Sequence, residues 1–169
     1  MVTKIASGKT LRGNVLKPQT KIHGDEENIY IWDMATIHTT YPGDLRTKAI
    51  HVQSGEAIIT DAPVDNEGRG EAFSPTDLLA ASLGSCMITI MGIRSRKRNI
   101  TIDGCRAEIT KIMASDPRRV SEVHVELYFP DVDYTPEDKK ILEDAAMNCP
   151  VAKSLHPDII QRINFHYSK

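Results

Sequence analysis

The feature that most constrains the fold is a nearly uninterrupted apolar segment in the middle of the chain. It runs from Leu78 to Met91 and contains mainly Leu, Ala, Ile and Met, with a single cysteine. The preceding tetrapeptide, Ser74–Asp77, supplies an N-cap hydroxyl, a proline at the first helical position and a carboxylate three residues after the cap. The sequence therefore predicts a helix that ends near Arg96. Because this helix is apolar nearly all round, it must be buried on most sides.

The same start signal recurs near the C-terminus. The tetrapeptide Thr135–Asp138 predicts a second helix to about Asn148, and Pro150 then opens a short helical piece that ends near Leu155. Alternating apolar and polar residues predict strands at 36–39, 46–52, 57–60, 100–113, 120–129 and 163–167. Strands, helix, strands, helix and strand is the element order of an α+β fold.

Composition divides the chain into an extension and one domain. Residues 1–35 are polar and interrupted by glycine and proline, and they are predicted to form an N-terminal extension with at most a hairpin. Residues 36–169 are long enough for a single core. The formal net charge of −2 gives no electrostatic footprint for nucleic acid.

The sequence also indicates where the protein works. No apolar run approaches the ~18 residues of a membrane span, and the N-terminal residues lack the apolar block of a secretory signal. Three cysteines, an odd number, argue against a structural disulfide framework. We therefore expect a cytoplasmic protein that binds neither membrane nor nucleic acid and in which any disulfide is transient.

Cys86 lies in the apolar helix, where a lone cysteine is more often a small core residue than a nucleophile. It is about three turns beyond Ser74, too far for the positive helix end to stabilise a thiolate, and burial disfavours the thiolate further. If Cys86 is reactive, a cation must come from elsewhere in the fold. The arginines before the helix are Arg12, Arg46 and Arg69.

Cys149 lies at the junction between the second helix and the short helix after it. It is predicted to be more accessible than a core residue and to cap the short helix, which favours a thiolate. Cys105, on a predicted strand, is interpreted as a packing residue. A thiol in each of two helices, without metal-type spacing, is typical of a peroxidatic and resolving pair.

Other kinds of site find little support in the sequence. The six histidines are scattered, with no Cys-x-x-Cys or His-x-x-x-His spacing, so we predict no metal site and no cofactor. There is no phosphate-binding loop, no dinucleotide fingerprint and no Gly-x-Ser-x-Gly elbow for a serine nucleophile.

The segments around both cysteines resemble one family. The run Phe73–Cys86 and the tetrapeptide Asn148–Val151, with 43–46 and 60–63 upstream, are similar to the OsmC/Ohr family of osmotically inducible and organic hydroperoxide resistance proteins, in its OsmC-like branch. The resemblance covers about residues 35–167. It implies antiparallel sheets packed around two central helices in an intertwined homodimer, with each active site at the subunit interface.

The resemblance also implies roles for individual residues. Cys86 matches the peroxidatic cysteine, Cys149 the resolving cysteine, and Arg46 the arginine that stabilises the thiolate and the peroxide oxygens. The hydroperoxide-resistance branch carries a glutamate directly after the helix-opening proline, where it orients this arginine, but here that position is Thr76. Glu71, in the preceding loop, is the candidate replacement carboxylate.

These features lead to one main hypothesis and two alternatives. The main hypothesis is a thiol-dependent peroxidase that reduces organic hydroperoxides in oxidative stress defence. Cys86 would be oxidised to a sulfenic acid, Cys149 would condense with it to a disulfide, and an external dithiol would reduce that disulfide. The first alternative, favoured by the missing glutamate, is a non-catalytic redox sensor or small hydrophobic ligand-binding protein that uses the same dimer cleft. The second is a metal-binding stress protein.

Overall fold

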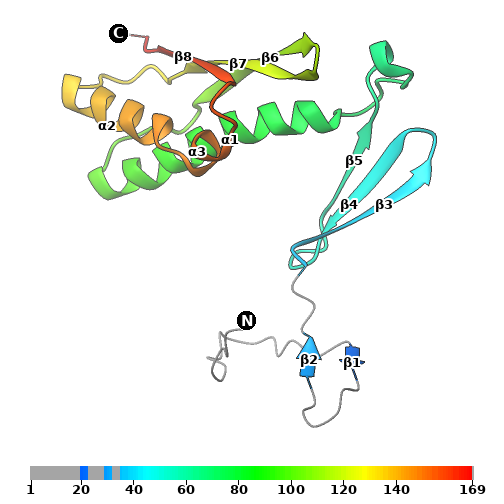
Figure 1. Cartoon of the computed structure of the whole chain (residues 1–169). Helices are drawn as coiled ribbons and strands as arrows, with labels where there is room; N and C mark the ends of the chain where they lie inside the picture. The colour runs from blue at the N-terminus through cyan, green and yellow to red at the C-terminus, as the bar shows by residue number, and fades with distance from the viewer. Residues whose placement is uncertain (1–19, 23–28, 32–34, 169) are drawn as a thin grey trace. The chain divides into compact units, whose positions relative to one another are not determined.

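The computed structural model of the chain describes residues 20–22, 29–31 and 35–168. The chain forms two compact units, one of residues 1–40 with 48–58 and the other of residues 41–47 with 59–169. Figure 1 labels the helices and strands of both. All residues proposed above for the site belong to the second unit, except Arg12, which lies outside the described residues.

The N-terminal strands pair locally. β1 (Thr20–Ile22) and β2 (Ile29–Ile31) are antiparallel partners, with Thr20 opposite Ile31. A second sheet has the order β3 (Ile37–Gly43), β4 (Arg46–His51) and β5 (Ala57–Asp61), as predicted from the alternation of residues. Most of the N-terminal extension lies outside the described residues, and its role stays a prediction.

The main sheet consists of β6 (Arg106–Ser115), β7 (Arg118–Tyr128) and β8 (Ile160–His166), with β7 in the middle. β6 and β7 form the predicted antiparallel hairpin, although β6 begins six residues later than expected. β8 pairs with β7 in parallel, which corrects the expectation of purely antiparallel sheets. A parallel pair needs a long crossover connection, and the helical segment between β7 and β8 provides one.

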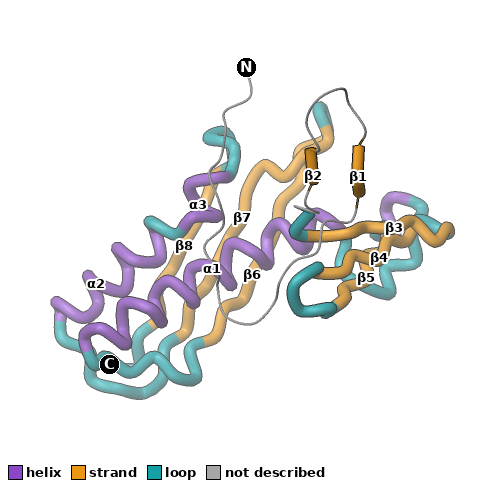
Figure 2. The backbone as a smooth tube through the Cα atoms, turned by 90° about the horizontal axis from the view of Figure 1, so that it is seen from below, coloured by secondary structure: helices purple, strands orange, loops and turns teal. Residues whose placement is uncertain are grey.

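One face of this sheet is covered by helices (Figures 1 and 2). Val123, Val125 and Leu127 of β7 alternate with polar residues and are fully buried. Helix α1 (Pro75–Arg98) packs against β6 and β7, and α2 (Pro136–Met147) and α3 (Pro150–Ser154) pack against α1. The predicted α+β fold with two main helices is confirmed.

The start of α1 shows why the helix forms where it does. The Ser74 Oγ accepts a hydrogen bond from the Asp77 backbone N–H (3.1 Å), and the Asp77 carboxylate accepts one from the Ser74 N–H (2.8 Å). This is the capping box predicted from the sequence. Farther along, a Cβ on Gly84 would lie 2.4 Å from the Ile109 Cδ1 on β6. The absence of a side chain at Gly84 therefore allows helix and sheet to approach closely.

The apolar character of α1 exceeds the sequence expectation. By length and composition this helix is apolar enough to cross a membrane, and 28% of the relevant window is buried in the single chain. The expectation that no apolar run reaches such a length is wrong because Ser, Thr and Gly interrupt the run without making it polar. A core helix of a water-soluble protein passes the same test, and α1 packs on a sheet and a second helix.

Candidate functional site

The structure brings Cys86 and Cys149 together. Cys86 is on α1, and Cys149 is the N-cap residue of α3, immediately after α2. Because α2 and α3 both pack against α1, residues 63 positions apart lie close together, and the neighbouring Cys86 thiol contributes to raising the pKa of Cys149. Both are free thiols, so the pair is in its reduced form.

The environments of the two thiols are the reverse of those expected. Cys149 is 0% exposed, and burial raises the pKa of its thiol, although its Sγ accepts the predicted capping hydrogen bond from the Ala152 N–H (3.4 Å). The expectation of an accessible thiolate at this junction is wrong because the junction packs onto α1, and desolvation outweighs the helix-end field. Cys86 is only partly buried, since part of α1 is uncovered in the single chain.

Cys105 is separate from this pair. It lies just before β6, is partly buried and packs against the hydrophobic core. Burial raises the pKa of its thiol. These observations agree with its interpretation as a packing residue.

The difference in exposure predicts a difference in reactivity. We expect iodoacetamide to label Cys86 at least about tenfold faster than Cys149 in the reduced native protein at pH 8, because only the accessible thiolate reacts. Mass spectrometry of tryptic peptides over time measures both rates, and unfolding in urea should abolish the difference. Equal native rates would show that Cys149 is not enclosed as described.

Arg46 follows a left-handed turn between β3 and β4. Gly43, Asp44 and Leu45 all have positive φ angles, of 111°, 53° and 59°. A leucine in this region is strained, and such strain persists only where surrounding contacts hold it. Here the Leu45 N–H donates to the Tyr41 hydroxyl (3.2 Å), and the Leu45 carbonyl accepts a hydrogen bond from the Ala62 N–H just after β5 (3.1 Å). The turn therefore fixes the backbone from which the Arg46 side chain extends.

The Arg46 guanidinium contacts two carboxylates. Its Nη2 donates to Asp61 Oδ2 (3.3 Å) and forms an ion pair with Glu71. The Arg46 side chain is 27% exposed, Asp61 is 0% exposed and Glu71 is 59% exposed. The structure thus places the candidate carboxylate Glu71 beside Arg46, and adds Asp61, which sequence reasoning missed.

Electrostatics favour the charged forms of Arg46 and Asp61. The hydrogen bond with Glu71 contributes most to raising the pKa of Arg46, followed by that with Asp61. The pKa of Asp61 is lowered, chiefly by the hydrogen bond from the Glu71 backbone N–H (3.0 Å), with a further contribution from Arg46 that helps to outweigh burial. The cluster is therefore a cation held between two anions.

The arginine cluster and the thiol pair are separate in the single chain. Within the described residues, the hydrogen bonds and ion pairs of the Arg46 side chain go to Asp61 and Glu71 and not to either cysteine. Thr76 and Asp77 at the start of α1 do not hold Arg46 either. They bind Lys111 of β6, whose Nζ donates to Thr76 Oγ1 (2.8 Å) and pairs with Asp77 Oδ1 (2.6 Å).

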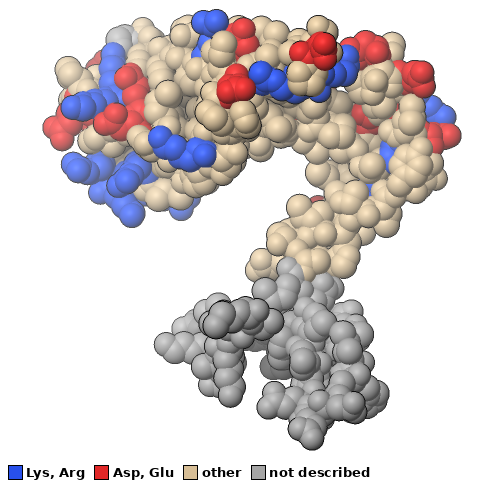
Figure 3. Space-filling view, in the orientation of Figure 1, with Lys and Arg blue, Asp and Glu red and all other residues tan. Residues whose placement is uncertain are grey.

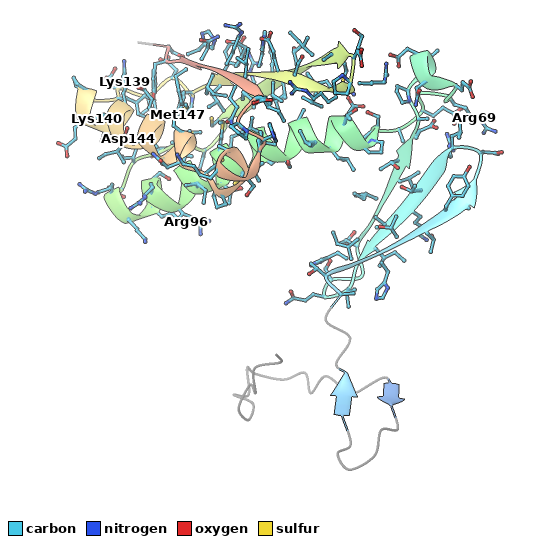
Figure 4. All side chains as sticks on the ribbon, in the orientation of Figure 1. Arg69, Arg96, Lys139, Lys140, Asp144 and Met147 are labelled. Carbon is cyan, nitrogen blue, oxygen red and sulfur yellow. The ribbon has the colours of Figure 1, made fainter. Side chains whose placement is uncertain are left out.

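A hollow of about 420 Å³ is lined by residues of α1 and α2, and by Asn148, but not by Cys86 or Cys149 themselves. Ile90, one helical turn beyond Cys86, and Asn148, which precedes Cys149, are both part of its lining. The complete lining is Ile90, Arg94, Lys97, Arg98, Ile141, Asp144, Ala145 and Asn148. Basic side chains gather at this C-terminal end of α1 (Figure 3), and Figure 4 labels Arg96 there and Asp144 on α2. The hollow combines apolar walls with a basic rim.

The described residues contain no group of three or more His, Cys, Asp or Glu side chains placed to hold a metal ion. His124 shares a hydrogen bond with Glu122 (2.9 Å), which also accepts one from the Arg162 Nε (2.8 Å). These side chains are paired with one another on the sheet. The metal-binding alternative therefore has no ligand set in the described part of the chain.

The chain belongs to the family of OsmC-like proteins. A family model described as OsmC-like protein matches residues 68–163, more than half of the chain. The crystal structure of a candidate osmotic stress induced and detoxification response protein from Psychrobacter arcticus 273-4 is 58% identical, with a TM-score of 0.77, and the match covers 82% of this chain and 100% of that one. A search of curated proteins gave no significant match.

More distant structures share the fold. An organic hydroperoxide resistance protein from Legionella pneumophila is 13% identical, with a TM-score of 0.63 and coverage of 79% of this chain and 98% of its own. Another, from Elizabethkingia anophelis, is 16% identical, with a TM-score of 0.61 and coverage of 80% and 98%.

Proposed function

Because the chain belongs to the OsmC-like protein family, we propose that it is a thiol-dependent peroxidase that reduces organic hydroperoxides. The observation that carries this proposal is the proximity of Cys86 and Cys149, which the packing of α2 and α3 on α1 brings together. Two cysteines from distant segments rarely need to meet for packing alone, whereas a peroxidatic and a resolving cysteine must form a disulfide. Proteins of related fold named for organic hydroperoxide resistance support the same assignment.

The exposure of the two thiols suits these roles. Cys86, the more exposed thiol, attacks the O–O bond of the hydroperoxide as a thiolate; the S–O bond forms as the O–O bond breaks, the leaving alkoxide takes a proton from water to become the alcohol, and Cys86 is left as a sulfenic acid. The buried Cys149 has a raised pKa and remains a thiol, so its S–H can donate a hydrogen bond to the Cys86 thiolate. Cys149 sulfur then attacks the Cys86 sulfur, the sulfenic oxygen leaves as water with the Cys149 proton, and a disulfide forms.

An external dithiol completes the cycle by reducing this disulfide to two thiols. We place the reaction in the cytoplasm, where reduced thiols are maintained. The hollow between α1 and α2, whose apolar lining residues are Ile90, Ile141 and Ala145, supports an organic hydroperoxide rather than hydrogen peroxide as substrate.

Arg46 enters the mechanism through a homodimer. We propose that it stabilises the Cys86 thiolate and the peroxide oxygens at a subunit interface, since one chain leaves it apart from the thiols. Large apolar side chains that are exposed in the single chain support such an interface, and they include Ile37, Tyr41, Ile58, Ile59, Phe73 and Ile93. An intertwined dimer would cover these residues and the free part of α1.

We expect the purified protein to sediment as a dimer at micromolar concentration and below. Obligate interfaces commonly bury about 2,000 Å² or more of largely apolar surface, which is consistent with the number of exposed apolar residues described above. Analytical ultracentrifugation over a hundredfold range of concentration measures this directly. A stable, soluble monomer would contradict the proposed interface.

Peroxide consumption by the purified protein tests the function itself. With dithiothreitol as reductant, we expect turnover of cumene hydroperoxide and linoleic acid hydroperoxide at a kcat/KM at least about tenfold above that for hydrogen peroxide. The alternative, a redox sensor or small hydrophobic ligand-binding protein, predicts no turnover with any of the three. A protein that oxidises once and is not reduced by dithiols would also support the alternative.

A further inference from the structure

The burial of Asp61 is unusual for a carboxylate. Its side chain is 0% exposed, at the end of β5, whereas most aspartates are found at the surface. Burial of an ionised carboxylate is costly unless it is paired and hydrogen-bonded. A buried and ionised Asp61 therefore needs hydrogen-bond donors or a cation that stabilise its negative charge.

The partners of Asp61 converge on one oxygen atom. Asp61 Oδ2 accepts a hydrogen bond from the Arg46 Nη2 (3.3 Å) and another from the Glu71 backbone N–H (3.0 Å). One carboxylate thus fixes both the guanidinium and the loop that carries the second carboxylate. Its position is fixed in turn by the Asp61 N–H, which donates to the Phe73 carbonyl (3.1 Å).

The neighbouring strands keep this geometry rigid. Thr47 and Thr60, the residues next to Arg46 and Asp61, share a hydrogen bond between their hydroxyls (2.5 Å). The Ala62 N–H donates to the carbonyl of the residue before Arg46 (3.1 Å). Hydrogen bonds between the residues on either side of Arg46 and Asp61 therefore fix the positions of both.

The other carboxylates near Arg46 are less suited to this task. Glu71 is 59% exposed, so solvent screens its ion pair with Arg46 and its side chain retains freedom to move. Asp77, at the start of α1, pairs with Lys111, and Thr76 accepts a hydrogen bond from the same lysine. The polar side chains at the start of α1 thus bind Lys111 of β6 and not Arg46.

We propose that Asp61 is the residue that positions Arg46, by holding its guanidinium from a buried site; this inference rests on the proposed role of Arg46 in the peroxidase reaction. Asp61 does not contact the reacting atoms and acts through Arg46 alone. Glu71 then has a secondary role at the exposed side of the same guanidinium. The lowered pKa of Asp61 agrees with this arrangement, since it keeps the carboxylate ionised.

The test compares Asp61→Asn with Glu71→Gln, which makes the same chemical change at the exposed carboxylate. Both are placed in a Cys105→Ser, Cys149→Ser background, and the pH dependence of Cys86 alkylation is followed. We expect Asp61→Asn to move the alkylation midpoint to higher pH in the same direction as Arg46→Ala, and Glu71→Gln to move it less. In the Arg46→Ala background, Asp61→Asn should produce no further shift.

The comparison of Asp61→Asn with and without Arg46→Ala tests whether Asp61 acts by positioning Arg46. A change that only destabilised the fold would shift the alkylation midpoint whether or not Arg46 is present. In proteins that retain the natural cysteines, Asp61→Asn should lower kcat/KM about tenfold or more, and Glu71→Gln by a smaller factor. An Asp61→Asn protein that behaves as the unmodified protein, while Arg46→Ala is slow, overturns the inference and leaves the proposed function intact. Absence of peroxide turnover by the unmodified protein instead overturns the proposed function.

A second measurement applies even if Asp61→Asn fails to fold. In Arg46→Met the Asp61 carboxylate loses one of the groups that lower its pKa, so this pKa should rise toward that of the unfolded chain. The unmodified protein, with the lower Asp61 pKa, loses more stability on acidification than the variant does, so the deficit in the midpoint of thermal unfolding should shrink as the pH falls from 5 to 3. The groups that face Asp61 in this measurement are Arg46 and the backbone of Arg69 and Glu71. If Arg46→Met lowers the midpoint of thermal unfolding by the same amount at every pH, the proposed pairing of Asp61 with Arg46 is overturned.

Discussion

Replacement of Cys86 by serine is expected to reduce hydroperoxide turnover at least about 1,000-fold, the scale typical for loss of a covalent nucleophile. A serine hydroxyl stays protonated near neutral pH, and within the described residues the titratable neighbour of this position is the Cys149 thiol, which is not a general base. The fold should be unaffected, because the two side chains are similar in size and Cys86 is only partly buried. Loss of cumene hydroperoxide with dithiothreitol as reductant is the measurement.

Cys105→Ser is the matched control for this experiment. Cys105 is also a partly buried free thiol, but it packs against the core away from the pair and should retain most of the activity. Cys149→Ser should retain the first oxidation and accumulate the Cys86 sulfenic acid, which a dimedone probe detects by mass. Equal losses in Cys86→Ser and Cys105→Ser would mean that turnover does not depend on a particular thiol.

Replacement of Arg46 by alanine is expected to lower kcat/KM for organic hydroperoxides about 100-fold, comparable to the loss of one preorganised electrostatic contact. The helix-end field is too distant to stabilise a Cys86 thiolate, so a cation must supply this stabilisation. The midpoint of Cys86 alkylation in the Cys105→Ser, Cys149→Ser background should therefore move to higher pH. Kinetics and the alkylation profile are measured on the same preparations.

Arg69→Ala is the control that removes a nearby arginine without removing the proposed cation. The Arg69 guanidinium pairs with Asp44 (3.1 Å), and both side chains are mostly exposed, so this pair contributes little. Figure 4 labels Arg69 in the loop beyond β5. Its replacement should change kcat/KM by less than about threefold. An unchanged alkylation profile in Arg46→Ala would show that Arg46 is not the activating cation.

The helices and most strands were predictable because their signals are local. The capping boxes at Ser74 and Thr135 depend on residues three positions apart, and both helices begin where these boxes place them. Strand alternation located the β6–β7 hairpin for the same reason. The parallel pairing of β8 was not predicted, since it depends on the path of the whole crossover segment.

The site was predictable only in part. The resemblance of the cysteine segments indicated which two thiols to compare, but exposure depends on packing between distant elements, so the environment of Cys149 was predicted wrongly. Asp61 was missed because nothing in its immediate sequence shows that it is buried or that it faces Arg46. Two signals were available: Asp61 lies at the end of a predicted strand, and it belongs to segment 60–63, which resembles the family together with the segment that contains Arg46.

The most direct test of the central claim is a titration of the fully reduced protein with cumene hydroperoxide in the absence of any reductant. The thiol-pair mechanism predicts that one equivalent per chain consumes two thiols, releases one equivalent of alcohol and produces a Cys86–Cys149 disulfide on peptide mapping, while Cys105 stays alkylatable. Unchanged thiols after several equivalents of hydroperoxide, or a disulfide that involves Cys105, would contradict it.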